Sequence, residues 1–270
     1  MTAANSAATP REAIDVQQLL RRTLSLVCLL VTGQGSVHAA ESRAEAFARL
    51  PDWQGIWISE EAADTGISGF PDTIGQPGAK PRQLMDPAGP WSAEGQRRFS
   101  ALFAGMAGRK ALGWGFPMMM ESPAPLQFLI TPEETLIINI YQEARHVYTD
   151  GRGHPPEEDR WVTTWGDSTG SWEGDTLLID TIWVRDPPRY FQAAPPFSDQ
   201  AHYVERLRMT APDRIEWEMT IEDPVTLTAP LQVKSAFVRT PNLDRLVHDA
   251  FENDRSELEG GTFTIAPPKE

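Results

Sequence analysis

Apolar and polar residues alternate through the second half of the chain with the period of two that strands show. The clearest case is residues 214–221, where every second residue is apolar: Ile215, Trp217, Met219 and Ile221. Other segments rich in Ile, Leu, Val, Tyr and Trp predict strands over 53–59, 126–130, 135–141, 144–149, 202–209 and 231–239, with a hairpin over 171–180. Many short strands without alternating helices predict a mainly β fold, an antiparallel barrel or sandwich.

The part of the chain before these strands predicts one helix and long loops. Ser92 can cap a helix that runs to about Arg109, because three apolar residues lie on one face: Phe99, Leu102 and Met106. Residues 44–50 predict a shorter lead-in helix. Residues 60–90 and 185–200 lack sustained periodicity, so we expect two long loops that cover a barrel mouth.

The N-terminal residues have the order of a secretory signal. Arg21 and Arg22 precede an apolar run over residues 23–31, and small residues around Ala39 supply a cleavage site. The run is shorter than the roughly 18 residues that span a bilayer. We therefore predict a signal peptide over 1–39, a single mainly β domain over 40–270 and a periplasmic or secreted location, with no stable membrane insertion after cleavage.

Composition excludes several classes of function. The 24 Lys and Arg against 38 Asp and Glu give a net charge of −14, which disfavours nucleic-acid partners. The one cysteine, Cys28, lies in the predicted signal, so thiolate chemistry is not expected in the mature chain. The histidines follow no compact metal-ligand spacing, and nucleotide and serine-hydrolase motifs are absent from the sequence. We expect neither a metal nor a cofactor.

One group of candidate catalytic residues is Asp199, His202 and Arg206. His202 and Arg206 share one face of their predicted strand, and Asp199 precedes it in the loop. An imidazole beside a carboxylate can act as a general base, while the guanidinium can bind substrate oxygen atoms. The alternative is structural: His202 can be a hydrogen-bonded sheet residue and Arg206 a partner of a neighbouring carboxylate.

A second group lies between residues 145 and 154. Alternation places His146 and Tyr148 on one face of their strand and Arg145 on the other. Tyr148 can donate a proton and His154 can accept one at a cavity rim, and Arg145 is a candidate for substrate binding. Asp150 and Arg152 are better explained as the staple of a turn.

Aromatic residues predict an apolar or aromatic ligand. Trp165 can stack on a ligand ring or fill the core, and nine tryptophans suit an aromatic-lined cavity. The Met-rich segment 113–120 is more typical of core filling than of a cavity wall.

Three stretches carry a resemblance to known proteins: Val147–Pro155, Gly170–Thr181 and Ser198–Arg206. They resemble the shared motifs of a large, mostly uncharacterised family of exported bacterial proteins, and the resemblance covers about residues 50–254. Gly55-Ile-Trp57 also resembles the opening of the first strand in lipocalin-like barrels. These likenesses imply a calycin-type barrel with an internal cavity. The family often carries His where this chain has Asp167, so no role is assigned to Asp167.

These observations lead to three hypotheses of function. The first is a cofactor-independent lyase or isomerase that uses acid–base chemistry on a small apolar or aromatic molecule in the barrel cavity. The second is a periplasmic binding or carrier protein that uses the same cavity. The third is a hydrolase that activates water. We favour the enzyme, because acid–base groups cluster with the loops.

Overall fold

The computed structural model describes most of the chain after the predicted signal peptide. The described residues from Arg43 onward belong to one compact unit. Residues 1–39, and therefore the predicted signal, lie outside the described part. The described residues are 42–65, 83–101, 114–141, 143–186, 195–241, 243–246, 256–259 and 262–265.

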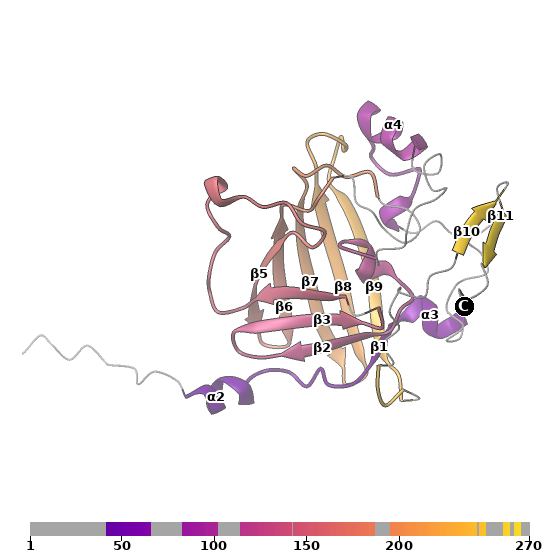
Figure 1. Cartoon of the computed structure of the whole chain (residues 1–270). Coiled ribbons are helices and arrows are strands. Elements are labelled where there is room, and N and C mark those ends of the chain that lie inside the picture. Colours follow the sequence, from indigo (N-terminus) through magenta and orange to yellow (C-terminus); the bar gives the residue numbers. More distant parts are fainter. Residues whose placement is uncertain are drawn as a thin grey trace, which may run out of the picture. The chain divides into compact units, whose positions relative to one another are not determined.

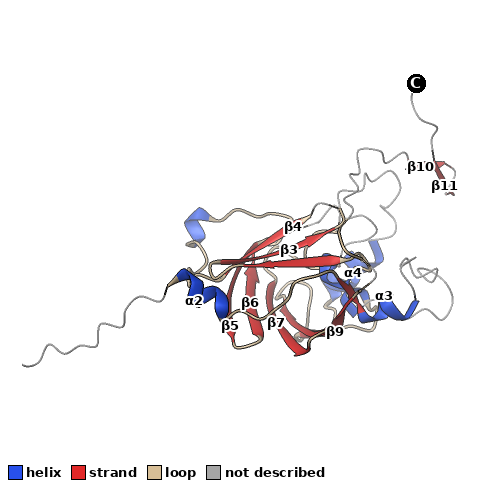
Figure 2. Ribbon diagram, turned by 90° about the horizontal axis from the view of Figure 1, so that it is seen from below, coloured by secondary structure: helices blue, strands red, loops and turns tan. Residues whose placement is uncertain are grey.

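Nine strands close into a barrel, which confirms the predicted mainly β fold (Figures 1 and 2). Each strand pairs with the next one along the chain, and the last returns to pair with the first. The barrel strands are β1 (Trp57–Ser59), β2 (Leu126–Ile130), β3 (Glu134–Asn139), β4 (Ala144–Tyr148), β5 (Asp167–Glu173), β6 (Thr176–Ile182), β7 (His202–Ala211), β8 (Arg214–Glu222) and β9 (Leu231–Arg239). Two further strands, β10 (Ser256–Glu259) and β11 (Thr262–Ile265), form a separate antiparallel pair.

One strand pair departs from the predicted antiparallel pattern. β4 and β5 run parallel and meet where Tyr148 lies opposite Thr169. A parallel pair requires a connection that crosses back over the sheet. Residues 149–166 make this connection, and we call them the crossover loop. This loop supplies one side of the site described below.

The helices agree with the sequence in part. α2 (Arg43–Ala48) matches the predicted lead-in helix. α4 (Ala93–Ala101) begins after Ser92, whose Oγ accepts a hydrogen bond from the Gly95 amide at 3.1 Å, as predicted for a cap. Its predicted continuation lies outside the described residues, as do residues 187–194 of the second long loop.

The prediction of an unbroken loop over residues 60–90 is wrong in its described parts. α3 (Glu60–Thr65) and a 3₁₀ turn, η1 (Gln83–Met85), occupy both ends of this stretch. The carboxylate of Glu60 accepts hydrogen bonds from Arg214 of β8 at 3.1 and 3.2 Å. This contact between distant residues anchors the helix to the barrel, and a local pattern could not reveal it.

The barrel interior is filled by side chains, in contrast to the internal cavity that the resemblance implied. A side chain that lines a void large enough for water would retain accessible surface. The inward-facing residues that retain none come from eight of the nine strands: Trp57, Leu126, Thr135, Ile137, Asn139, Arg145, Val147, Leu177, Thr181, Glu205, Leu207, Ile215, Trp217, Ile221, Val233 and Phe237. At these positions the barrel is a packed core.

An ion pair lies inside this core. The guanidinium of Arg145 on β4 binds the carboxylate of Glu205 on β7, and both side chains are fully buried. Thr181 accepts a further hydrogen bond from Arg145 at 2.9 Å. The indole N–H of Trp217 donates to Glu205 at 3.0 Å. The charges are therefore compensated by each other and by polar neighbours.

A buried segment, residues 114–120, packs against this ion pair and is called the plug segment. All its residues are buried, which confirms that the Met-rich stretch fills the core. The Phe116 ring lies 3.9 Å from the guanidinium carbon of Arg145. The Gly115 amide donates to Glu143 at 2.8 Å, and burial raises the pKa of that carboxyl.

The segment before β1 is tied to the last barrel strand. Arg239 on β9 stacks over the Trp57 ring at 4.7 Å and donates hydrogen bonds to the carbonyl groups of Gln54 and Asp52. The Trp57 indole N–H donates to the Trp53 carbonyl at 2.9 Å. These contacts fix Trp53 against the barrel.

Candidate functional site

The three motifs singled out in the sequence meet on the outer face of the barrel. Strand register places four outward side chains in one row across β4, β5, β6 and β7: Tyr148, Thr169, Asp180 and Val204. On each strand, the residues directly before and after the row residue face the core, because successive side chains of a strand point to opposite faces. His202 stands beside this row, two residues before Val204.

A chain of hydrogen bonds joins two histidines and two aspartates at this row. His154, from the crossover loop, contacts Asp167 through Nδ1 at 2.6 Å and Asp180 through Nε2 at 2.9 Å. The other oxygen of Asp180 contacts Nε2 of His202 at 2.8 Å. We call these four residues the His–Asp chain.

The two halves of the His–Asp chain differ in exposure. The side chains of Asp167 and His154 are 10% and 21% exposed, whereas those of Asp180 and His202 are 43% and 38% exposed. Nδ1 of His202 has no hydrogen-bond partner among the described residues. The arrangement therefore runs from a largely buried carboxylate, that of Asp167, to a partly exposed imidazole, that of His202.

Hydrogen-bond chemistry restricts where the protons lie. A carboxylate only accepts hydrogen bonds, so the Nε2 atom of His202 carries the proton that it donates to Asp180. In the neutral imidazole, Nδ1 of His202 then presents a lone pair. His154 has a carboxylate at each ring nitrogen, so both contacts are satisfied when both nitrogens are protonated. In the neutral form, His202 thus donates to Asp180 through Nε2 and can accept through Nδ1.

The crossover loop is fastened over this face, which corrects the predicted role of Asp199. The sequence paired Asp199 with His202. The Asp199 carboxylate instead lies 3.2 Å from the guanidinium of Arg160, which also donates to the Asp199 carbonyl at 3.0 Å. Asp180 takes the place next to His202, because Asp199 lies in the turn before β7.

A buried aspartate positions the turn that leads to His202. Asp223 accepts hydrogen bonds from the amide and hydroxyl of Ser198, at 2.7 and 2.8 Å, and from Val225 and Thr226. Burial by itself would raise the pKa of Asp223, but these hydrogen bonds outweigh it and hold the pKa below its usual value. The charged form of Asp223 therefore stabilises the folded protein.

We expect Asp223→Asn to destabilise the protein by about 1–3 kcal/mol at pH 7, because the amide cannot accept all of these hydrogen bonds. A carboxyl group with a lower pKa in the folded state contributes its full stabilisation of the folded protein when the pH is above its pKa in the unfolded state. This stabilisation is lost as the pH falls through its pKa in the folded state. Urea unfolding between pH 7 and pH 3 measures both effects. An unchanged gap between wild type and variant down to pH 3 would contradict the assignment.

The other predicted site residues fall at different places. Tyr148 lies in the outward row, with the Arg152 guanidinium 4.3 Å from its ring, and Asp150 pairs with Arg152 as the turn staple. Trp165 is partly buried and packs against the core. Arg206 is exposed on the same face of β7 as His202, four residues further along.

Arg145 requires a correction. The sequence placed it on the opposite face from Tyr148, which the structure confirms, and made it a substrate-binding residue. Because its side chain is fully buried and paired with Glu205, no substrate can reach it in this structure. Its role is within the core.

The sequence did not single out Asp180 and Arg160, although both organise the site. A usable signal for Asp180 was the hairpin turn at Gly174, whose φ of +59° suits glycine. Counting outward from this turn pairs Asp180 with Thr169 on the face opposite the core. Arg160 had no such signal, because its contact depends on the path of the crossover loop.

Comparisons with known proteins give no family for this chain. No protein-family model matches it, and no curated protein matches it significantly. Among the described residues, no group of three or more His, Cys, Asp or Glu side chains is arranged so that it could hold a metal ion. None of the described helices is long and apolar enough to cross a membrane.

Proposed function

We propose that the protein is an exported enzyme that moves protons on a small molecule, with His202 as the catalytic base. The hydrogen bond from His202 to Asp180 carries this proposal, because in the neutral imidazole it leaves the lone pair on Nδ1, on a side chain that is 38% exposed. A base of this kind removes a proton next to a carbonyl group, which is the shared step of many lyases and isomerases. The reaction needs no redox change.

The remaining members of the His–Asp chain act as positioning residues. Asp180 orients the His202 ring and stabilises it when it becomes protonated, as the aspartate of a catalytic triad does. His154 holds Asp180 in place, and Asp167 fixes His154. Tyr148 lies in the outward row that includes Asp180, and its phenol is our candidate for the proton donor to the substrate oxygen.

The surface beside His202 favours a small apolar or aromatic substrate. Val204 is 46% exposed although it is apolar, and it lies opposite Asp180 in the strand register. Tyr148 adds an aromatic ring at the other end of the row. This outer surface replaces the barrel cavity as the proposed reaction site, and the packed interior gives no support to a carrier that stores a ligand inside the barrel.

Exchange of carbon-bound hydrogen tests this function without knowledge of the natural substrate. We expect the protein to accelerate deuterium uptake from D2O next to the carbonyl group of 2-tetralone, and we expect His202→Asn to reduce the rate to that of buffer. Proton nuclear magnetic resonance measures the exchange. General bases contribute about 10²–10⁴-fold, so the difference is measurable.

A second histidine of the protein supplies a matched control. His146 on β4 also contacts a carboxylate, that of Glu134, but it lies outside the His–Asp chain. His146→Asn should leave the exchange rate unchanged. The proposal fails if the wild-type protein does not accelerate exchange, or if His202→Asn and His146→Asn behave alike.

A further inference from the structure

Arg206 is an exposed cation on the outer face of β7. No hydrogen bond or ion pair joins its guanidinium to another described residue. The register places it opposite Glu218 on β8, but that carboxylate contacts Nζ of Lys234 on β9 at 2.8 Å. The next outward cation on β7, Arg208, pairs with Glu216 at 2.9 Å. The guanidinium of Arg206 therefore presents its donors to solutes.

An apolar surface lies between this guanidinium and His202. Side chains two residues apart on a strand share a face, so Val204 separates His202 from Arg206. Val204 is 46% exposed, and the half-buried Leu178 of β6 lies opposite Arg206. We call Val204 and Leu178 the apolar strip. The outer face of β7 thus carries an imidazole, the apolar strip and a guanidinium, in that order.

Negative charge gathers at the His202 end of this surface. Asp180 contacts His202 at 2.8 Å, and the exposed Glu222 of β8 lies opposite His202 in the register. These carboxylates repel an anionic group of a ligand, whereas the guanidinium of Arg206 attracts it. A ligand with one carboxylate therefore orients with that group at Arg206 and with its uncharged end at His202.

The separation of the two ends sets the length of the ligand. Four residues of antiparallel strand span about 13 Å between His202 and Arg206. A contact of about 3 Å is needed at each end, between the base and the reacting carbon and between the guanidinium and the carboxylate. About 7 Å then remains between the reacting carbon and the carboxylate oxygen. Two fused rings that carry the carboxylate at the far end suit this length.

We propose that Arg206 binds a carboxylate of the substrate, and that the substrate is a small aromatic or other apolar ketone with this carboxylate remote from its reacting carbon. The rings lie on the apolar strip, and the reacting carbon lies at Nδ1 of His202. The placement at His202 rests on the function proposed above, whereas binding of the carboxylate by Arg206 does not. The guanidinium donates hydrogen bonds to the carboxylate and takes no part in proton transfer.

Binding of 6-carboxy-2-tetralone to the full chain tests the proposal. The uncharged 2-tetralone-6-carboxamide has the same shape and provides the matched ligand. We expect the carboxylate to bind at least about threefold more tightly at pH 7 and low salt, because an exposed ion pair contributes up to about fivefold in affinity. Nuclear magnetic resonance titration measures both dissociation constants, and the backbone amide resonances of Val204 and Arg206 should shift. The preference for the carboxylate should fall as salt is added.

Substitutions on β7 locate the anion site. Arg206→Glu should reverse the preference for the carboxylate over the amide, because the attraction becomes a repulsion. Arg206→Gln should remove the preference and keeps the test valid if Arg206→Glu does not fold. Arg208→Glu makes the same change in net charge two residues further along, where the wild-type side chain already pairs with Glu216. It should keep the preference within about twofold, because water and salt screen a charge at that distance.

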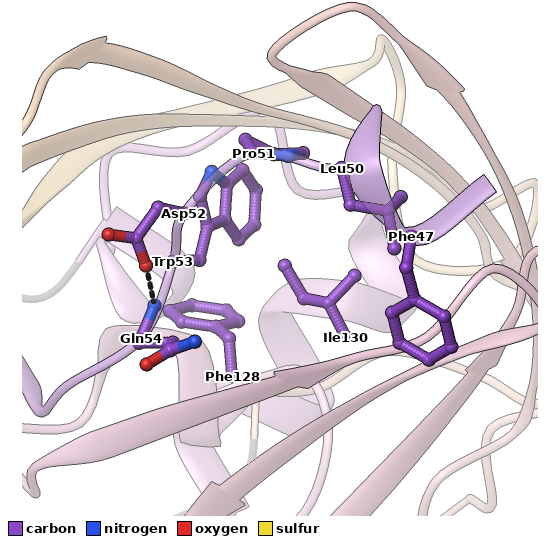
Figure 3. Close-up of a pocket in the computed structure, with 8 residues that line it drawn as sticks. All are labelled: Phe47, Leu50, Pro51, Asp52, Trp53, Gln54, Phe128 and Ile130. Atoms are coloured by element: carbon purple, nitrogen blue, oxygen red, sulfur yellow. Dashed lines mark hydrogen bonds between the residues drawn. The ribbon is translucent and has the colours of Figure 1, made fainter. Parts of the chain in front are cut away.

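The pocket before β1 is the competing location for the rings of the ligand. It has a volume of about 230 Å³ and lies between the N-terminal segment and β2 (Figure 3). Among the described residues that line it, only Asp52 is charged, so this pocket favours the amide over the carboxylate. Leu50→Trp places an indole in this pocket and should leave the affinity for the carboxylate unchanged.

Equal affinity of the wild-type protein for the two ligands overturns the proposal. A preference that survives both Arg206 substitutions, or that Arg208→Glu removes to the same extent, also overturns it, because the anion is then held elsewhere or by net charge alone. Weaker binding of the carboxylate to folded Leu50→Trp places the ligand in the pocket and has the same consequence.

Deuterium exchange in the same samples keeps the two proposals apart. Binding with the expected preference but without exchange supports the anion site at Arg206 and overturns His202 as the base. Exchange without a preference for the carboxylate supports His202 as the base and overturns the anion site.

Discussion

Replacing Arg145 with Met is expected to lower the free energy of unfolding by about 3–5 kcal/mol, because the carboxylate of Glu205 is then buried without its counter-ion. Neither side chain has accessible surface, so water cannot replace the lost partner. Phe116 also loses the guanidinium that stacks on its ring. Urea unfolding followed by tryptophan fluorescence measures the change at pH 7.

The double variant Arg145→Met/Glu205→Leu separates the charge from the packing. It should be more stable than Arg145→Met alone, because removal of both charges leaves no unpaired ion in the core. It should remain less stable than wild type, because the indole N–H of Trp217 then lacks its acceptor. A double variant as unstable as the single one would show that packing, and not charge, dominates.

An exposed ion pair on neighbouring strands provides the control. Arg208 on β7 contacts Glu216 on β8 at 2.9 Å, and both side chains are more than 40% exposed. Arg208→Met should change the free energy of unfolding by less than about 1 kcal/mol, because water screens the pair. A loss as large as that of Arg145→Met would contradict the argument from burial.

Alternation along the strands was sufficient to predict the faces of the barrel. Ile215, Trp217 and Ile221 were assigned to one face, and all are buried. The pattern did not predict what the inner face encloses, since the sequence of one strand carries no information about the size of the closed space. Arg145 shows the consequence: its face was predicted, but its partner Glu205 lies 60 residues away.

The site shows the same limit in another form. His202 and His154 were chosen because imidazoles suit acid–base chemistry, and the structure brings both to one carboxylate. That carboxylate belongs to Asp180, which reaches His202 only when β6 and β7 pair in a particular register. The nearer residue in sequence, Asp199, turns to Arg160 because the crossover loop passes beside it.

Asp180→Asn is expected to lower the catalysed deuterium exchange by about 10²–10⁴-fold while the fold stays intact. Both oxygens of Asp180 accept hydrogen bonds from histidine, and an asparagine amide can accept only one of them. The amide nitrogen then faces a ring nitrogen and favours the tautomer with the proton on Nδ1 of His202. In that tautomer Nδ1 has no lone pair for the substrate.

Nitrogen-15 resonances of His202 measure the tautomer directly, so the cause of the lost activity can be separated from a general structural defect. Glu134→Gln is the matched control, because it removes the carboxylate partner of His146 and should leave both the exchange rate and the His202 tautomer unchanged. If Asp180→Asn retains wild-type exchange while His202→Asn loses it, His202 acts without an orienting carboxylate. The His–Asp chain would then serve to fasten the crossover loop to the barrel.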